Sequence, residues 1–92
     1  MTEAEFTSIY AAIVKDNKSP MVNVDTHAGH VIVPRDLVEE DGSILLDISP
    51  TAVRGLKVEH GTVYCRASFH KEVFCLSFPL VSIIEIHAGD SV

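Results

Sequence analysis

The chain has 92 residues, of which 47% are hydrophobic and 22% are charged. This length suits one domain and is too short for two independent cores. Seven Lys and Arg against 13 Asp and Glu give a formal charge of −6, which opposes binding to nucleic acids and to anionic membranes. No run approaches the roughly 20 apolar residues of a membrane span, and the N-terminal stretch is acidic where a secretory signal is basic. We therefore expect a cytoplasmic protein.

The first predicted element is an amphipathic helix over residues 3–15. Its apolar side chains recur at the i, i+3, i+4 and i+7 positions of one helix face, namely Phe6, Ile9, Tyr10 and Ile13. Thr2 followed by Glu5 matches a capping box at the start, and the turn formers of residues 16–20 end the helix before Pro20. Both ends of the helix are therefore marked.

Beyond Pro20 the sequence changes to short runs rich in Val, Ile and Phe, separated by turn formers. Strands are predicted at residues 21–26, 31–33, 44–48, 56–59, 62–69, 73–78 and 83–87. The expected fold class is α+β, mostly β. An N-terminal helix is followed by a meandering, strongly bent sheet or partly open barrel.

Two of these strands have informative faces. In residues 62–69 the core face is predicted to carry Val63, Cys65, Ala67 and Phe69. In residues 73–78 neither face is clearly polar, so we expect both faces of this strand to be covered.

Signatures of catalysis and of metal binding are weak. The chain has no Gly-x-Ser-x-Gly elbow, no phosphate-binding Gly-rich loop and no His-Glu-x-x-His pair. Asp25, His27 and His30 offer at most a surface metal site, and solvated turn histidines are the favoured interpretation. The acidic residues 39–41 precede Gly42 and are interpreted as a solvated turn rather than an acid-base pair. We expect no enzyme activity, no cofactor and no metal.

Cys65 and Cys75 lie on strands predicted to be neighbours. A cross-strand disulfide is one interpretation, and two reduced cysteines in a cytosolic protein is the other. The second is favoured because no export signal is present.

Six short motifs follow one another along the chain, each occurring once. The motifs are Val-Ile-Val-Pro at 31–34, Asp-Gly-Ser-Ile at 41–44, Leu-Asp-Ile-Ser-Pro-Thr-Ala-Val at 46–53, Ala-Ser-Phe at 67–69, Ser-Phe-Pro-Leu at 77–80 and Ile-Ile-Glu-Ile-His-Ala at 83–88. Together with Tyr10 and the Asp16-Asn17 turn, these motifs extend over some 80 residues, and in their order and spacing the chain resembles the folded domain of the SspB adaptors. These adaptors deliver proteins carrying the ssrA degradation tag, which is added to stalled chains, to the ClpXP protease.

The resemblance implies a single tag-binding domain over residues 1–92 that catalyses no step of proteolysis. Residues 1–17 would form a dimerisation helix, and residues 20–88 a β body with a groove for the tag. It assigns the groove to Thr51, Ala52, Val53, Ala67, Ser68 and Phe69, with Leu37 and Val38 alongside. It assigns the homodimer contact to Phe6, Ile9, Tyr10 and Ile13.

This chain departs from the family in two respects. Ser68 stands where familiar members carry Arg, which removes a charge that holds the peptide or its acidic residues. The family's flexible tail, which docks on the ClpX unfoldase, is not present in this chain.

Other interpretations remain open from sequence. The apolar helix stripe suits a dimer interface, or it covers the chain's own sheet. The small residues Ala52, Ala67 and Ser68 permit close approach of another backbone, or they simply pack tightly. The alternative function is a small RNA-binding barrel of Sm-like or OB-like type, which the negative charge disfavours.

Overall fold

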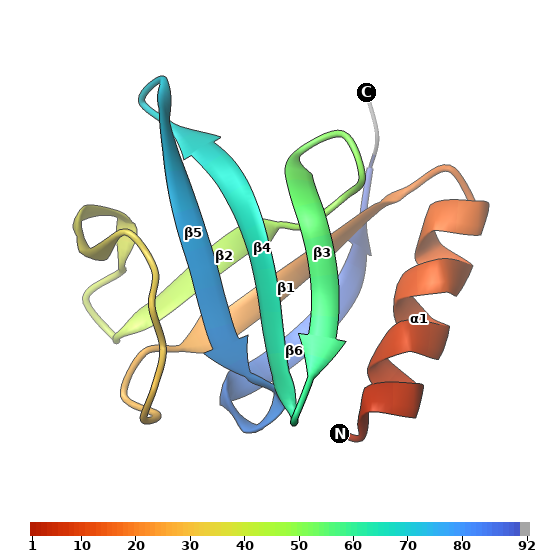
Figure 1. Cartoon of the computed structure of the whole chain (residues 1–92), viewed down its shortest axis with the longest axis horizontal. Coiled ribbons are helices and arrows are strands. Elements are labelled where there is room, and N and C mark those ends of the chain that lie inside the picture. Colours follow the sequence, from red (N-terminus) through yellow and green to blue (C-terminus); the bar gives the residue numbers. More distant parts are fainter. Residues whose placement is uncertain (91–92) are drawn as a thin grey trace.

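The computed structural model describes residues 1–90 of the chain (Figure 1). It contains helix α1 (Glu3–Lys15) and strands β1 (Ser19–Asp25), β2 (Ser43–Asp47), β3 (Val53–Glu59), β4 (Thr62–Phe69), β5 (Glu72–Pro79) and β6 (Ile83–Gly89). Two short 3-10 helices, η1 (Arg35–Leu37) and η2 (Leu80–Ser82), lie in the connections. The predicted α+β, mostly β class is confirmed.

The six strands form two antiparallel sheets. The first has the order β2-β1-β6 and the second β3-β4-β5, so β1 and β4 are the central strands. In Figure 1 the second sheet crosses in front of the first, and α1 runs beside β3. Among residues 1–90 the strands do not close into a barrel.

The core lies between the two sheets. Alternation along β4 buries Val63 and Cys65 and exposes Tyr64 and Arg66, which confirms the predicted faces. Each of the other strands adds apolar side chains to the same layer. The largest fully buried side chains include Phe6, Val22, Val24, Ile44, Ile48, Val63 and Phe78.

Helix α1 covers one side of this core, with the bounds that the sequence predicts. The Thr2–Glu5 capping box is present at its start. Phe6 is only 1% exposed and stacks on Tyr10, whose hydroxyl donates a hydrogen bond of 2.8 Å to the Ile48 carbonyl oxygen. Part of the apolar stripe therefore packs against the chain's own β body.

The predicted strand at residues 31–33 is wrong. Val31 and Val33 are buried and Ile32 is exposed, as in a strand, but only Ile32 pairs, through a single bridge to Ser77 of β5. Pro34 has no backbone N–H to continue the pairing on one side. On the other side, His30 has a φ of 64°, which turns the chain out of extended geometry.

The prediction that both faces of β5 are covered is also wrong within this chain. Phe74, Leu76 and Phe78 face the core, but the opposite face leaves Cys75 exposed and Val73 70% exposed. Among residues 1–90, the part of that side that carries Val73 and Cys75 is left uncovered, while Ser77 is partly buried. An apolar side chain therefore stands open on the outer face of the second sheet.

Candidate functional site

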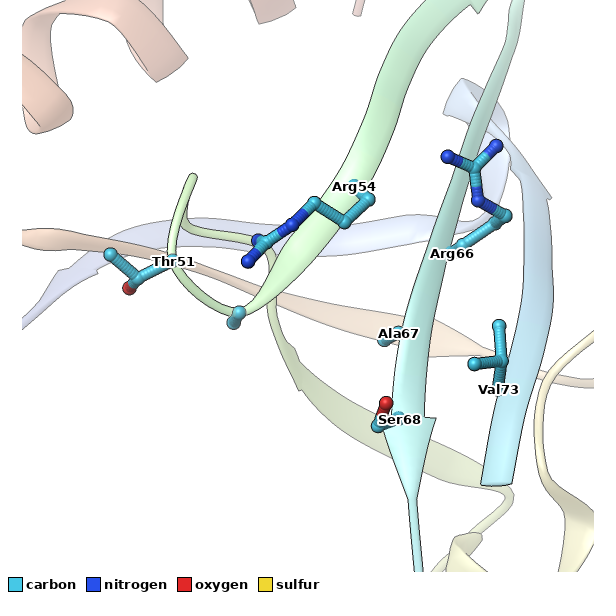
Figure 2. A pocket seen from close by; sticks show the side chains of 7 residues that line it. Thr51, Arg54, Arg66, Ala67, Ser68 and Val73 are labelled. Atoms are coloured by element: carbon cyan, nitrogen blue, oxygen red, sulfur yellow. The ribbon is translucent and has the colours of Figure 1, made fainter. Parts of the chain in front are cut away.

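A hollow of about 320 Å³ lies on the outer face of the second sheet. It crosses the sheet where β3 begins, β4 ends and β5 begins. Its lining comes from the turn before β3 and from all three strands, as Figure 2 shows. The lining residues are Thr51, Ala52, Arg54, Arg66, Ala67, Ser68 and Val73.

The turn at residues 49–53 positions one wall of this hollow. The Ser49 carbonyl oxygen accepts hydrogen bonds from the backbone N–H groups of Ala52 and Val53, at 3.0 and 3.1 Å. The Asp47 carboxylate accepts from the Ser49 backbone N–H at 2.9 Å. These local bonds hold Thr51 and Ala52 at the entrance to β3.

Four of the eight residues assigned to the groove by resemblance line this hollow: Thr51, Ala52, Ala67 and Ser68. Val53 does not, because its side chain is buried in the core; its backbone pairs with Ala67 beneath the hollow. The turn that carries Thr51 and Ala52 and the strand end that carries Ala67 and Ser68 are some 15 residues apart in the sequence. In the sheet they are neighbours.

Phe69 lines a second hollow of about 370 Å³, formed with Pro34, Arg35, Asp36 and the β4-β5 hairpin. Val73 belongs to both hollows, so they adjoin at this side chain. Leu37 and Val38 line neither: Leu37 is exposed, and Val38 packs against the core. The loop preceding them, rather than these two residues, borders the second hollow.

Arg54 and Arg66 are lining residues that the sequence interpretation missed. They are direct partners in the β3-β4 register. Arg66 shares the exposed face of β4 with Ser68, and this alternation was a usable signal. No sequence signal indicated Arg54, because the face on which it lies depends on an irregularity in the β3-β4 pairing between Arg54 and Lys57.

Gly55 occupies that irregularity, with a φ of 66° that favours glycine. A Cβ at this position would lie 3.2 to 3.4 Å from the Arg66 guanidinium, tighter than ordinary contact. The absence of a side chain thus allows Arg66 to lie against the β3 backbone. Beyond the irregularity, Lys57 pairs with Tyr64 and returns to the same outer face as Arg54.

The hollow is electropositive although the chain as a whole carries −6. Neither Asp nor Glu lines it. The Arg54 guanidinium donates to the carbonyl oxygens of Pro50 and Val53, at 3.2 and 3.1 Å. Within residues 1–90, neither Arg54 nor Arg66 has a carboxylate within ion-pairing distance.

The lining suits binding rather than nucleophilic catalysis. Thr51 and Ser68 supply hydroxyls, but no histidine or carboxylate lines the hollow to activate either of them. Ala52 and Ser68 are short enough to admit a backbone, Ala67 borders the hollow although its side chain packs against the core, and Val73 offers an apolar contact. The arrangement combines a shallow floor, one apolar wall and two cations.

The other polar clusters are surface features. His27 Nδ1 lies 3.2 Å from the Asp25 carboxylate, and both side chains are largely exposed. Asp41 accepts hydrogen bonds from the Ser43 backbone and hydroxyl, which lower the pKa of its carboxyl. Among the described residues no group of three or more His, Cys, Asp or Glu is placed to hold a metal ion.

The two cysteines are free and lie on opposite faces of the second sheet. Cys65 points into the core, where burial raises the pKa of its thiol to about 11. Cys75 is exposed on the outer face and pairs in register with Arg66. The disulfide interpretation is therefore wrong for this fold.

The residues assigned to a dimer contact divide between two sides of α1. Phe6 and Tyr10 face the chain's own sheets. Ile9 is 38% exposed and lines a shallow surface depression with Ala4, Glu5 and Ser8. Ile13 is half-buried. Self-association through α1 stays a prediction, and Phe6 is too deeply buried to contribute to it.

A scan against protein-family models finds no match for the chain, and a search of curated proteins finds no significant relative. Of the helices in residues 1–90, none has the length and apolar character needed to cross a membrane.

Proposed function

We propose that the protein is a non-enzymatic adaptor of the SspB type, which binds the ssrA degradation tag as an extended peptide and delivers tagged proteins to ClpXP. The observation that carries this proposal is the coincidence of two placements. The hollow on the outer face of the β3-β4-β5 sheet is lined by Thr51, Ala52, Ala67 and Ser68, which the resemblance to the family assigns to the tag groove.

The chemistry of the hollow supports a peptide ligand. Small side chains in its floor let a peptide backbone approach, and a peptide side chain can pack on Val73, which is apolar and 70% exposed. The adjoining hollow beyond Val73 extends the surface toward Phe69. Together they offer about 320 and 370 Å³, enough for several residues of an extended chain.

As an adaptor, the protein acts through effective concentration. Holding the tag and the ClpX unfoldase at once turns a weak encounter into an intramolecular one. A homodimer through the exposed side of α1, around Ile9, would present two tag sites. No cofactor enters this mechanism, and the protein itself breaks no bond.

The direct test is fluorescence anisotropy with a labelled ssrA peptide and a scrambled peptide of the same composition. Saturable binding of the ssrA peptide, with binding of the scrambled peptide at least about tenfold weaker, is the expected result. The Ala52→Gln variant places bulk in the floor and should weaken binding while circular dichroism shows an unchanged fold. Equal binding of both peptides, or of neither, refutes the tag-binding function.

RNA binding is the second candidate, because the outer face of the second sheet carries Arg54, Lys57 and Arg66 together with the exposed ring of Tyr64. The net charge of −6 opposes it. Salt discriminates between the two: RNA affinity falls steeply between 50 and 200 mM salt, whereas groove-held peptide responds weakly.

A further inference from the structure

We infer that Arg54 and Arg66 form a carboxylate-binding subsite that selects peptides with an acidic side chain. This inference rests on the proposed peptide-binding function and names the chemistry that the site recognises. It is carried by the register of the two arginines, their unpaired state and the composition of the hollow around them.

The two arginines are an unfavourable pair by themselves. Arg54 and Arg66 are directly opposite in the β3-β4 register, and like charges in that relation destabilise a sheet. The chain has 13 Asp and Glu, yet none lines the hollow. By contrast, Lys57 on the same strand pairs with Glu59 at 3.3 Å. An anion from outside the chain would relieve the repulsion.

The two arginine side chains border the hollow and extend in different directions. Figure 2 shows Arg54 extending toward Thr51, and Arg66 extending along β4 away from Ser68. Arg54 is tied by one nitrogen to the carbonyl oxygens of Pro50 and Val53, which leaves its other N–H groups to donate.

The Arg66 guanidinium has no hydrogen bond to any group in residues 1–90. It lies against Gly55 and is exposed, so another staggered rotamer would bring it toward Ser68. A carboxylate above Ala67 and Ser68 would thus receive charge-assisted hydrogen bonds from both arginines, with the Ser68 hydroxyl as a third donor.

The surface favours an internal acidic side chain over a terminal carboxylate or a nucleic acid. The hollow and the second hollow share Val73 in their linings, so an extended peptide that crosses this side chain would run through the subsite rather than end in it. A polyanion would meet the repulsion of the whole chain at −6, whereas one carboxylate meets mainly the two cations nearest to it.

The test compares labelled ssrA peptide with an analogue in which every Asp and Glu becomes Asn or Gln, both amidated at the C-terminus. The full chain, Arg54→Gln, Arg66→Gln and the control Lys57→Gln are titrated by anisotropy. Lys57→Gln removes one positive charge from the same face outside the hollow. We expect each arginine variant to bind the acidic peptide about tenfold more weakly and the control to bind it normally.

The charge-neutral analogue should bind the full chain weakly and be insensitive to either arginine variant. Equal binding of the two peptides overturns the subsite, as does an equal effect of the Lys57 and arginine variants. A free C-terminus that restores the analogue to full affinity also overturns it, because the site would then read a terminal carboxylate.

A second measurement separates this inference from the proposed function. Acetyl-Ala-Asp-Ala-amide and acetyl-Ala-Asn-Ala-amide are titrated into the labelled protein by NMR, and the Arg Nε–H resonances are followed. Shifts of Arg54 and Arg66 with the Asp peptide alone support the subsite even if the ssrA peptide does not bind. Shifts with neither peptide, or with both, overturn it. A competing oligoribonucleotide that shifts them more strongly assigns the pair to RNA instead.

Discussion

Truncating Phe6 to alanine measures how far the fold depends on the docking of α1. The Phe6 side chain is 1% exposed, belongs to the core cluster and stacks on Tyr10 with ring centroids 6.1 Å apart. Replacing a buried Phe with Ala removes its transfer free energy and leaves a cavity, which together cost about 3–5 kcal/mol. A domain of 92 residues has a total stability of roughly 5–14 kcal/mol, so the variant should lose a large fraction of it.

Urea unfolding followed by circular dichroism gives the free energy of unfolding for the wild-type chain and the variant. The matched control is Ile9→Ala on the exposed side of the same helix, where a loss below about 1 kcal/mol is expected. Similar losses in the two variants, or a Phe6→Ala loss below about 1 kcal/mol, would refute the docking of α1 on the β body. The helix would then be held mainly by a partner.

Three further predictions address the dimer, the strand irregularity and the buried thiol. Ile9→Glu should give a folded monomer by light scattering, because a pair of charges is costly to bury across a two-fold axis; a persisting dimer contradicts that interface. Gly55→Ala should lower the free energy of unfolding in urea by about 1–2 kcal/mol, because φ at this position is 66° and the new Cβ crowds Arg66. The variant should also bind an acidic peptide more weakly. Unchanged stability and binding would contradict the role given to Gly55 in the β3-β4 irregularity. The raised pKa of Cys65 predicts that stability is full below about pH 8.5, where the unfolded thiol keeps its proton, and falls by about 2 kcal/mol as the pH approaches 11; Cys65→Ala should lose this component, and equal pH profiles would contradict it.

Local sequence signals predicted the elements whose determinants lie within a few residues. The bounds of α1 follow from the apolar period and from Thr2 and Glu5, which cap it without help from the rest of the chain. Strand β4 follows equally well, since its alternation of apolar and polar side chains is unbroken from Val63 to Ser68.

The errors arise where pairing partners decide the structure. Val31 and Val33 are buried on either side of an exposed Ile32, as in a strand. Whether such a segment pairs depends on the edge strand that it can reach, and residues 31–33 pair with β5 only at Ile32. The outer face of β5 illustrates the same limit. A strand with apolar residues on both faces is normally covered on both, and the sequence does not indicate that Val73 stays open.

The sequence likewise identified the short side chains of the hollow but not its charge. The motifs shared with the SspB family assign four of its lining residues to a groove, namely Thr51, Ala52, Ala67 and Ser68. Their positions are set locally, by the turn at 49–53 and by the end of β4. Arg54 enters the hollow only through the irregularity at Gly55, which couples two strands and has no signature beyond a single glycine.

The position of the two arginines changes what the serine at position 68 implies for tag preference. An arginine missing at 68 suggested a site without a cation, but Arg66 lies two residues earlier on the same face of β4, about 7 Å away at the usual rise of a strand. Arg54 lies on the neighbouring strand, about 5 Å across from Arg66. If the chain binds an extended tag as proposed, the positive charge is displaced along β4 rather than lost, and the site keeps its preference for an acidic side chain.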